Sequence, residues 1–167
     1  MKKLAFLAVC LFAAACGYHL VGTGGSLPAE IRRIRVPLFE NRTTRFQLDL
    51  KLTNAVIDEF VSRGKVEITT DAAKADAVLV GRILTFIATP IAFSNKTADR
   101  YEIRVVTEIA LKNAKTDQII FSNPSYMFKT DYQVPQGSDF ESSQSTALDT
   151  LAQLYARSLI VAILEGF

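Results

Sequence analysis

The sequence predicts an α+β domain: a two-layer sandwich in which two helices pack on one face of a mostly antiparallel sheet of four to five strands. Three observations lead to this fold class. Two long segments repeat an apolar residue about every fourth position, which is the period of an amphipathic helix. The segments between them alternate apolar and polar residues, as half-buried strands do. The order strand, helix, strands, helix then lets both helices cover one side of a single sheet.

The first strand and the first helix follow a glycine-rich stretch. Residues 31–39 are rich in β-branched side chains and contain Pro37, which predicts a strand with an edge-like end. Thr44 and Gln47 have the spacing of a capping box, so the helix is predicted to begin there, and Gly64 is placed to end it. Its apolar stripe recurs at every fourth residue: Leu48, Leu52, Val56 and Phe60.

The central part of the chain predicts further strands over residues 66–69, 77–89, 101–112 and 118–128. The second of these is apolar on both faces, so we expect it to be buried on both sides. The third alternates most regularly, with an apolar core face and a second face that carries charges of both signs. Residues 94–100 are predicted to form a polar turn, and residues 113–117 a turn that closes an antiparallel hairpin.

A second, longer helix is predicted to run to the C-terminus. Residues 132–137 are expected to form a loop, and Ser138 with Glu141 has the spacing of another capping box. The apolar stripe that follows covers one side of the helix and would pack on the sheet. It consists of Ala147, Leu148, Leu151, Leu154, Tyr155, Leu159, Ala162 and Ile163.

The N-terminal segment has the layout of a lipoprotein export signal. Lys2 and Lys3 precede an apolar stretch, residues 4–15, which ends in three alanines directly before Cys16. The stretch is too short for a transmembrane helix, which needs about 20 apolar residues. We therefore expect residues 1–15 to be removed as a signal peptide and Cys16 to carry the lipid. An ordinary secretory signal followed by a chance cysteine is the alternative.

The rest of the chain is predicted to divide into two regions. Residues 16–28, the lipidated N-terminus and a flexible tether, are rich in glycine and lack periodicity. Residues 29–167 form the single α+β domain. Gly17 follows the cysteine where an aspartate would favour retention in the inner membrane, so we expect an outer-membrane lipoprotein of a Gram-negative bacterium.

Charge and residue types argue against several functions. Two of the 19 Lys and Arg residues belong to the signal peptide, and the others balance the 17 Asp and Glu residues, so the charge does not favour a nucleic-acid partner. The single histidine, His19, lies in the tether, where it cannot pair with a serine of the domain or complete a metal site. We therefore expect no enzyme activity, no metal and no cofactor.

Four elements of the mature chain occur in an informative order. Residues 16–20 read Cys-Gly-Tyr-His-Leu, and residues 36–43, which end the first strand, read Val-Pro-Leu-Phe-Glu-Asn-Arg-Thr. An amphipathic helix follows, and a terminal helix ends in Leu-Glu-Gly-Phe at residues 164–167. Together these elements resemble the LPS-assembly lipoprotein family (LptE) over essentially the whole mature chain.

The resemblance implies a plug inside the lumen of the LptD outer-membrane β-barrel, which helps the barrel to fold and contacts lipopolysaccharide on its way to the outer leaflet. It also implies basic side chains between two central strands that bind lipopolysaccharide phosphates, a position held here by Lys96 and Arg100. The alternative is that these cations only solvate a polar turn. The same two interpretations apply to Arg42 and Arg45, which flank the first helix. Residues 132–140 lack the Lys or Arg of a second basic contact.

The partners on this interpretation are an LptD-type β-barrel, lipopolysaccharide and the membrane that holds the N-terminal lipid. The main alternative is an accessory lipoprotein subunit of another envelope secretion or adhesion complex, because the Phe-Glu-Asn-Arg-Thr element also looks like part of such lipoproteins. A third hypothesis, a periplasmic hydrolase that uses carboxylates, is disfavoured because the domain contains no histidine and no paired carboxylate motif.

Overall fold

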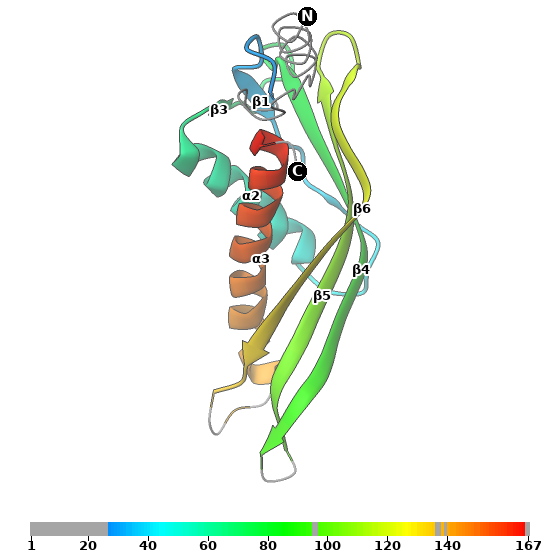
Figure 1. The fold of residues 1–167 in the computed structure, drawn as a ribbon, viewed down its shortest axis with the longest axis vertical. Helices are drawn as coiled ribbons and strands as arrows, with labels where there is room; N and C mark the ends of the chain where they lie inside the picture. The colour runs from blue at the N-terminus through cyan, green and yellow to red at the C-terminus, as the bar shows by residue number, and fades with distance from the viewer. Residues whose placement is uncertain (1–26, 95–96, 136–137, 139, 166–167) are drawn as a thin grey trace, which may run out of the picture.

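The computed structural model describes residues 27–94, 97–135, 138 and 140–165 of the chain. The predicted signal peptide, the predicted lipidation site Cys16, residues 16–26 of the predicted tether, and Lys96 lie outside these residues. Six strands and two helices follow one another along the described chain (Figure 1). They are β1 (Arg33–Arg35), β2 (Glu40–Asn41), α2 (Leu48–Arg63), β3 (Glu67–Ile68), β4 (Ala77–Ser94), β5 (Thr97–Asn113), β6 (Ile119–Gln133) and α3 (Phe140–Glu165).

The strands form one sheet in the order β3-β1-β4-β5-β6, and β2 pairs with β4 beyond the end of β1. The long β4–β5 and β5–β6 pairs are antiparallel and supply most of the paired residues, whereas the short pairs of β1 with β3, β1 with β4 and β2 with β4 are parallel. Helices α2 and α3 pack against each other on one side of this sheet (Figure 1). The predicted fold class, two helices on one face of a mostly antiparallel sheet, is therefore confirmed.

The strand predicted over residues 31–39 is broken into two pieces. β1 covers only three residues and is an interior strand between β3 and β4, so only the end of the predicted strand, at Pro37, lies off the sheet. The chain then leaves the sheet at Pro37, which has no N–H for a ladder hydrogen bond, and returns to β4 as β2. Between the two pieces Phe39 turns into the core, and its N–H donates to Thr53 Oγ1 at 3.0 Å.

The sequence predicted that strand β4 is buried on both faces, and this prediction is wrong. Its first half buries Leu79 and Ile83 completely, whereas Val80 on the other face is 40% exposed. A register shift immediately after Ile83 reverses the alternation, so that Phe86 packs against the core and Ile87 is exposed. The bulge explains why the apolar residues of this segment do not follow one strand period from end to end.

The β4–β5 hairpin is longer than predicted. β4 continues through Pro90 to its last residue, Ser94, and β5 begins at Thr97, so the polar turn predicted over residues 94–100 is largely strand. A register shift beside Pro90 accommodates its missing N–H. The predicted alternation of β5 is confirmed, because its core face is fully buried at Ile103, Val105, Thr107, Ile109 and Leu111.

Helix α2 begins at Leu48, later than the sequence predicted. Gln47 precedes it in the left-handed conformation with φ 58°, and its side chain makes no capping hydrogen bond. A residue inside a right-handed helix cannot be left-handed, so Gln47 is not part of the first turn and the predicted Thr44–Gln47 capping box is wrong. The predicted C-terminus is confirmed: Gly64, with φ 62°, donates its N–H to carbonyls of the last turn.

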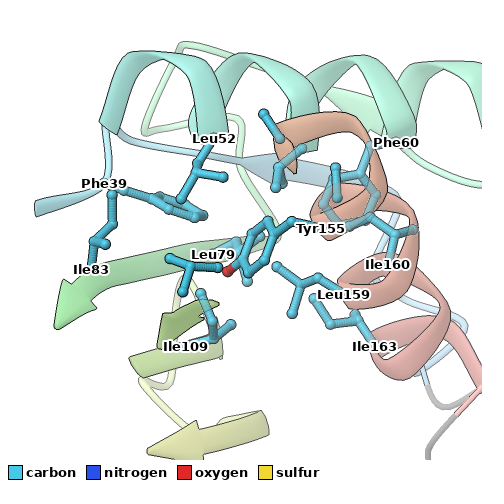
Figure 2. Packing of buried hydrophobic residues seen from close by; sticks show 14 of the residues in the cluster. Phe39, Leu52, Phe60, Leu79, Ile83, Ile109, Tyr155, Leu159, Ile160 and Ile163 are labelled. Carbon is cyan, nitrogen blue, oxygen red and sulfur yellow. The ribbon is translucent and has the colours of Figure 1, made fainter. Parts of the chain in front are cut away.

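Helix α3 closes the core over the sheet. Tyr155 lies at the centre, with Leu159 and Ile163 one and two turns further along the same face (Figure 2). The predicted stripe differs at Leu154, which is 37% exposed. The segment Ser143–Glu165 is long and apolar enough to cross a membrane, but over half of its most apolar window is buried inside the domain, as expected of a core helix.

A polar contact inside the core fixes α3 on the sheet. The Tyr155 hydroxyl lies 2.8 Å from Thr107 Oγ1 of β5, and both residues are fully buried. Burial raises the pKa of Tyr155 far above its usual range, so the hydroxyl stays protonated. Its ring packs edge-on against Tyr126 and Phe128 of β6, with centroid distances of 5.8 and 6.1 Å.

We predict that Gly81→Ala destabilises the domain, because a Cβ at Gly81 would lie 2.7 Å from three atoms of the buried Phe39 ring. Overpacking of this kind typically costs about 1–3 kcal/mol, measurable by urea denaturation of the non-lipidated protein. A smaller side chain at position 39 should relieve the clash. Phe39→Leu should therefore lower the free energy of unfolding less in the Gly81→Ala background than in the wild type. Additive costs in this double-mutant cycle would contradict the close packing.

Candidate functional site

The site predicted from the sequence lies at the end of the β4–β5 hairpin, far from the start of the described chain (Figure 1). Arg100 belongs to β5 and not to a turn; it is exposed, and its Nε donates to Gln133 Oε1 at 3.3 Å. Lys96 lies outside the described residues. On the β4 side of the same end, Ile91 and Phe93 are 47% and 66% exposed. The hairpin end therefore combines a cation with exposed apolar side chains.

The other two candidate cations have partners within the chain. Arg42 donates from Nε to Glu40 Oε1 at 2.8 Å. The guanidinium of Arg45 stands over the ring of Phe86, 5.0 Å from its centroid. Both arginines thus hold the segment that joins β2 to α2 against the sheet, which supports their structural interpretation.

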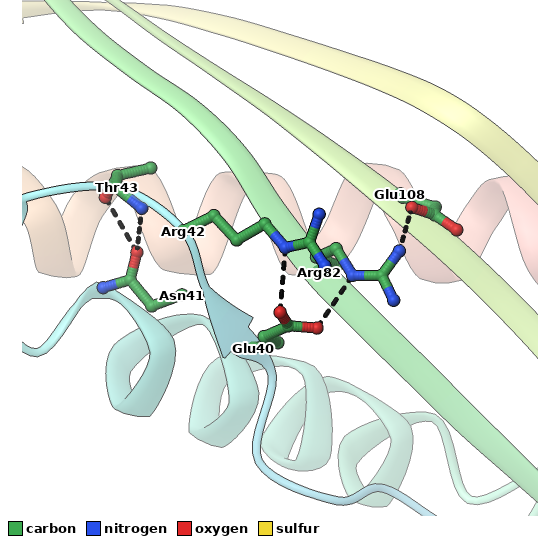
Figure 3. Close-up of polar contacts among 6 residues, drawn as sticks. All are labelled: Glu40, Asn41, Arg42, Thr43, Arg82 and Glu108. Atoms are coloured by element: carbon green, nitrogen blue, oxygen red, sulfur yellow. Dashed lines mark hydrogen bonds and ion pairs between the residues drawn. The ribbon is translucent and has the colours of Figure 1, made fainter.

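Asn41 organises the turn after β2. Its Oδ1 accepts hydrogen bonds from the N–H and the hydroxyl of Thr43, at 2.9 and 2.8 Å, and its Nδ2 donates to the carbonyl of Arg45 at 2.8 Å. The first two of these bonds are drawn in Figure 3. An aspartate could not supply the donor. In the segment that resembles the LptE motif, Phe39 therefore serves the core and Asn41 the turn.

Glu40, the residue between them, bridges the outer face of the sheet, which is the face turned away from the helices (Figure 3). Its two carboxylate oxygens accept from Arg42 Nε and from Arg82 Nε, each at 2.8 Å. Arg82 in turn donates from Nη1 to Glu108 Oε2 at 2.6 Å. The chain of ion pairs links β2, β4 and β5 across the sheet.

The contacts in this bridge stabilise the charged forms of Glu40 and Arg82. The hydrogen bond from Arg82, followed by that from Arg42, holds the pKa of Glu40 below its usual range. The same contact with Glu40, followed by that with Glu108, raises the pKa of Arg82. Because Glu40 and Arg42 are exposed and Arg82 and Glu108 are only half-buried, the bridge fixes geometry more than it adds stability.

A second group of charges continues along the outer face towards the hairpin end. Glu102 Oε1 accepts from Arg104 Nη2 at 2.9 Å and lies 3.9 Å from Lys129 Nζ on β6. Near the other end of β5, Lys112 lies 3.5 Å from Asp117. The mixed charge predicted for this face of β5 is thus observed, and many of its charges pair with neighbours in the sheet.

Hollows on the surface are shallow and open. One of about 340 Å³ lies beside the Glu40 bridge, between Leu38 and Val80, and another of about 480 Å³ lies between Leu38 and Phe46. A third, of about 1060 Å³, lies near the start of the described chain and is lined by the Arg33–Asp76 ion pair. The hydrogen bond from the Arg33 side chain lowers the pKa of Asp76.

These arrangements suit binding better than catalysis. Among the described residues, no group of three or more His, Cys, Asp or Glu side chains is placed to hold a metal ion. The Glu40 carboxylate accepts from two arginines, which stabilises its charged form and makes it a poor general acid. What the domain presents is a paired, mixed-charge sheet face and a hairpin end where Arg100 lies near exposed apolar side chains.

Comparison with known proteins gives this architecture a family. A family model described as LptE, Lipopolysaccharide-assembly, matches residues 31–163. The chain belongs to this family. It is thus a lipopolysaccharide-assembly lipoprotein of the Gram-negative envelope, as its motif order suggested. A comparison with curated proteins found no match.

Solved structures share the fold of this LptE-family protein at low sequence identity. The PelC dodecamer from Paraburkholderia phytofirmans is 14% identical with a TM-score of 0.56, over 86% of this chain and 96% of that one. The hypothetical protein CT253 from Chlamydia trachomatis is 10% identical with a TM-score of 0.55, over 80% and 95%. Lipoprotein B from Nitrosomonas europaea is 10% identical with a TM-score of 0.52, over 87% and 90%.

Two features of this LptE-family domain were not predicted from the sequence. The bridge from Glu40 to Arg82 joins residues 42 positions apart, and only the parallel pairing of β2 with β4 brings them together. Phe46 is 81% exposed. A signal for it was present, because Phe46 does not fit the four-residue repeat that begins at Leu48.

We predict that Glu40→Gln lowers stability in a pH-dependent way. The pKa of Glu40 is lower in the folded state than its ordinary value of 4.5, so its contribution is fully present above that value and is lost as the pH falls through the folded pKa. The difference in urea midpoint between wild type and Glu40→Gln should therefore be largest near pH 7 and shrink below pH 4.5. Glu30→Gln, at an exposed position in another part of the domain, is the control. An equal difference at both pH values would contradict the role of the Glu40 charge.

Proposed function

We propose that this LptE-family protein is an outer-membrane lipoprotein that plugs an LptD β-barrel, helps it to assemble and assists lipopolysaccharide transport to the outer leaflet. The observation that carries the proposal is the outer sheet face, where charges of both signs are paired across the four strands β2, β4, β5 and β6. Barrel interiors of this class are polar, so such a face can lie against a lumen wall with few charges left unpaired.

The anchor follows from the sequence prediction. A lipid on Cys16 would tether the domain through residues 17–28, and several acyl chains on one residue give stable attachment where a single chain gives only marginal binding. The domain would then need no spanning helix of its own, and α3 can serve the core.

The hairpin end is the proposed lipopolysaccharide contact. Arg100, together with Lys96, would bind phosphate groups through charge-assisted hydrogen bonds. Ile91 and Phe93, exposed at the same end, offer apolar contacts to acyl chains. A ligand with phosphates beside acyl chains matches this pairing of side chains.

A second candidate function is supported by one observation. The fold likeness extends to PelC, which forms a dodecamer, at a TM-score of 0.56. A protein of this fold can therefore be the subunit of a large oligomer, which supports the secretion-complex alternative. The family match favours the barrel plug, and the state of assembly distinguishes the two.

The expected state is a stable complex of about one to one with a large β-barrel, purified from solubilised outer membranes. Depletion of this chain should leave the barrel misfolded and lipopolysaccharide missing from the cell surface, because the plug is needed while the barrel closes. The mass of the solubilised complex and the identity of its second chain are the measurements. A free monomer would reject the plug, and a ring of this chain alone would favour the secretion complex.

We predict that Lys96→Glu with Arg100→Glu weakens lipopolysaccharide binding by about tenfold or more, since two charge-assisted contacts become repulsive. Binding should be measured at low salt, where these contacts are strongest. The fold should be retained, because exposed charges usually change stability by less than about 0.5 kcal/mol. The matched control is Arg32→Glu with Lys65→Glu, two exposed cations near the other end of the domain. Equal binding by wild type and the hairpin variant would leave Lys96 and Arg100 as solvating residues.

A further inference from the structure

An exposed apolar patch lies where the segment before α2 crosses the edge of β4. It consists of Leu38, Phe46, Leu50 and Val80, which are 60%, 81%, 47% and 40% exposed. We call these four residues the Phe46 patch. Leu38 lines both of the hollows described beside it, one with Val80 and the other with Phe46 and Leu50, so it lies between the other members of the patch. Exposed apolar surface gathered in this way, with a polar rim, is typical of an interaction site.

The patch is held in one conformation by the contacts around it. Phe39 anchors the segment in the core, and Asn41 fixes the turn that follows. Arg45, next to Phe46, is stacked on Phe86 of β4. Gln47 on the other side is left-handed, with φ 58°, an unfavourable conformation for a residue with a side chain. Phe46 is thus presented by a rigid segment, so little conformational entropy is lost when it is bound.

The charges that border the patch are balanced and largely paired. Glu40, Arg82 and Glu108 line its Val80 side. Arg42, which donates to Glu40, supplies the second cation, so the two carboxylates are balanced by two arginines. On the opposite side, the hollow at Phe46 is lined by one cation, Arg45, and one anion, Asp49. Such a border has no excess charge of either sign. It complements a neutral protein surface and offers little to an anionic headgroup layer.

The position of the patch agrees with this choice of partner. The segment between β1 and α2 runs beside β4 about midway along the molecule, away from the hairpin end and from the start of the described chain (Figure 1). A surface at mid-length faces sideways from a domain tethered at one end. In the plug arrangement, that direction points at the wall of the surrounding barrel.

We propose that the Phe46 patch docks into an apolar pocket on the inner wall of the partner β-barrel, with Phe46 as the anchoring side chain; this rests on the proposed function. Interfaces concentrate binding energy in a few rigid aromatic residues surrounded by a satisfied polar rim. The mixed-charge sheet face would supply complementarity over the larger area. The patch supplies the affinity and fixes the rotation of the domain within the barrel.

The test compares Phe46→Asp with Val61→Asp in the full-length lipoprotein expressed with its native barrel. Val61 is also apolar and 60% exposed but lies near the other end of α2. The measurement is the amount of barrel recovered with each variant from solubilised outer membranes. Phe46→Asp should reduce recovery about tenfold or more, the change expected from loss of a hot-spot residue, while Val61→Asp should match wild type. Both purified variants should keep the wild-type thermal midpoint and lipopolysaccharide binding.

Photocrosslinking keeps the test independent of folding yield. A benzoylphenylalanine at position 46 should form a covalent product with the barrel, and one at position 61 should not. Barrel recovery with Phe46→Asp equal to wild type would overturn the docking proposal and leave the proposed function standing. Crosslinks from position 46 to lipid alone would overturn it in favour of a membrane contact. If wild type itself recovers no barrel, the proposed function fails and the docking proposal fails with it.

Discussion

Phe39 packs on the bare backbone of Gly81 and donates its N–H to Thr53 of the first helix. The sheet, the segment before α2 and α2 itself meet at this contact. Because successive side chains of an extended chain point in opposite directions, burying Phe39 turns Glu40 outward, where it reaches Arg82. Insertion of Phe39 into the core therefore also fixes the position of the outer ion pairs. A shift of this segment by one residue would place Glu40 in the core and remove both contacts.

The fold class was predictable because the spacing of apolar residues along the chain indicates which side of each helix or strand is buried. The buried sides decide which elements pack together. The regular alternation of β5 and the four-residue repeat of α2 gave their core faces correctly. Where the structure departs from the sequence prediction, a local backbone feature intervenes. The bulge after Ile83 exchanges the faces of β4, and left-handed Gln47 moves the start of α2. Such features depend on long-range contacts, which a pattern of local residues does not encode.

The candidate site was less predictable than the fold for a related reason. Single cations can be found in a sequence, but their partners cannot: Arg42 and Arg45 looked like Lys96 and Arg100 until the structure paired them with Glu40 and Phe86. The family assignment rests on the order of soft motifs, and the structure now gives one of those motifs a physical basis. In residues 39–41, side chains for the core, the outer face and the turn follow in succession.

The arrangement of the long strands bears on how the chain folds. β4, β5 and β6 are consecutive in sequence and pair as a meander, so their contacts form between segments that are already close. The parallel pairs of β1 and β2 with β4 enclose whole intervening segments, including α2, and must overcome a larger loss of chain entropy. Local contacts form fastest. The β4–β5–β6 meander is thus expected to form early in folding. The segment that carries Phe39 and Phe46 is expected to pack against it later.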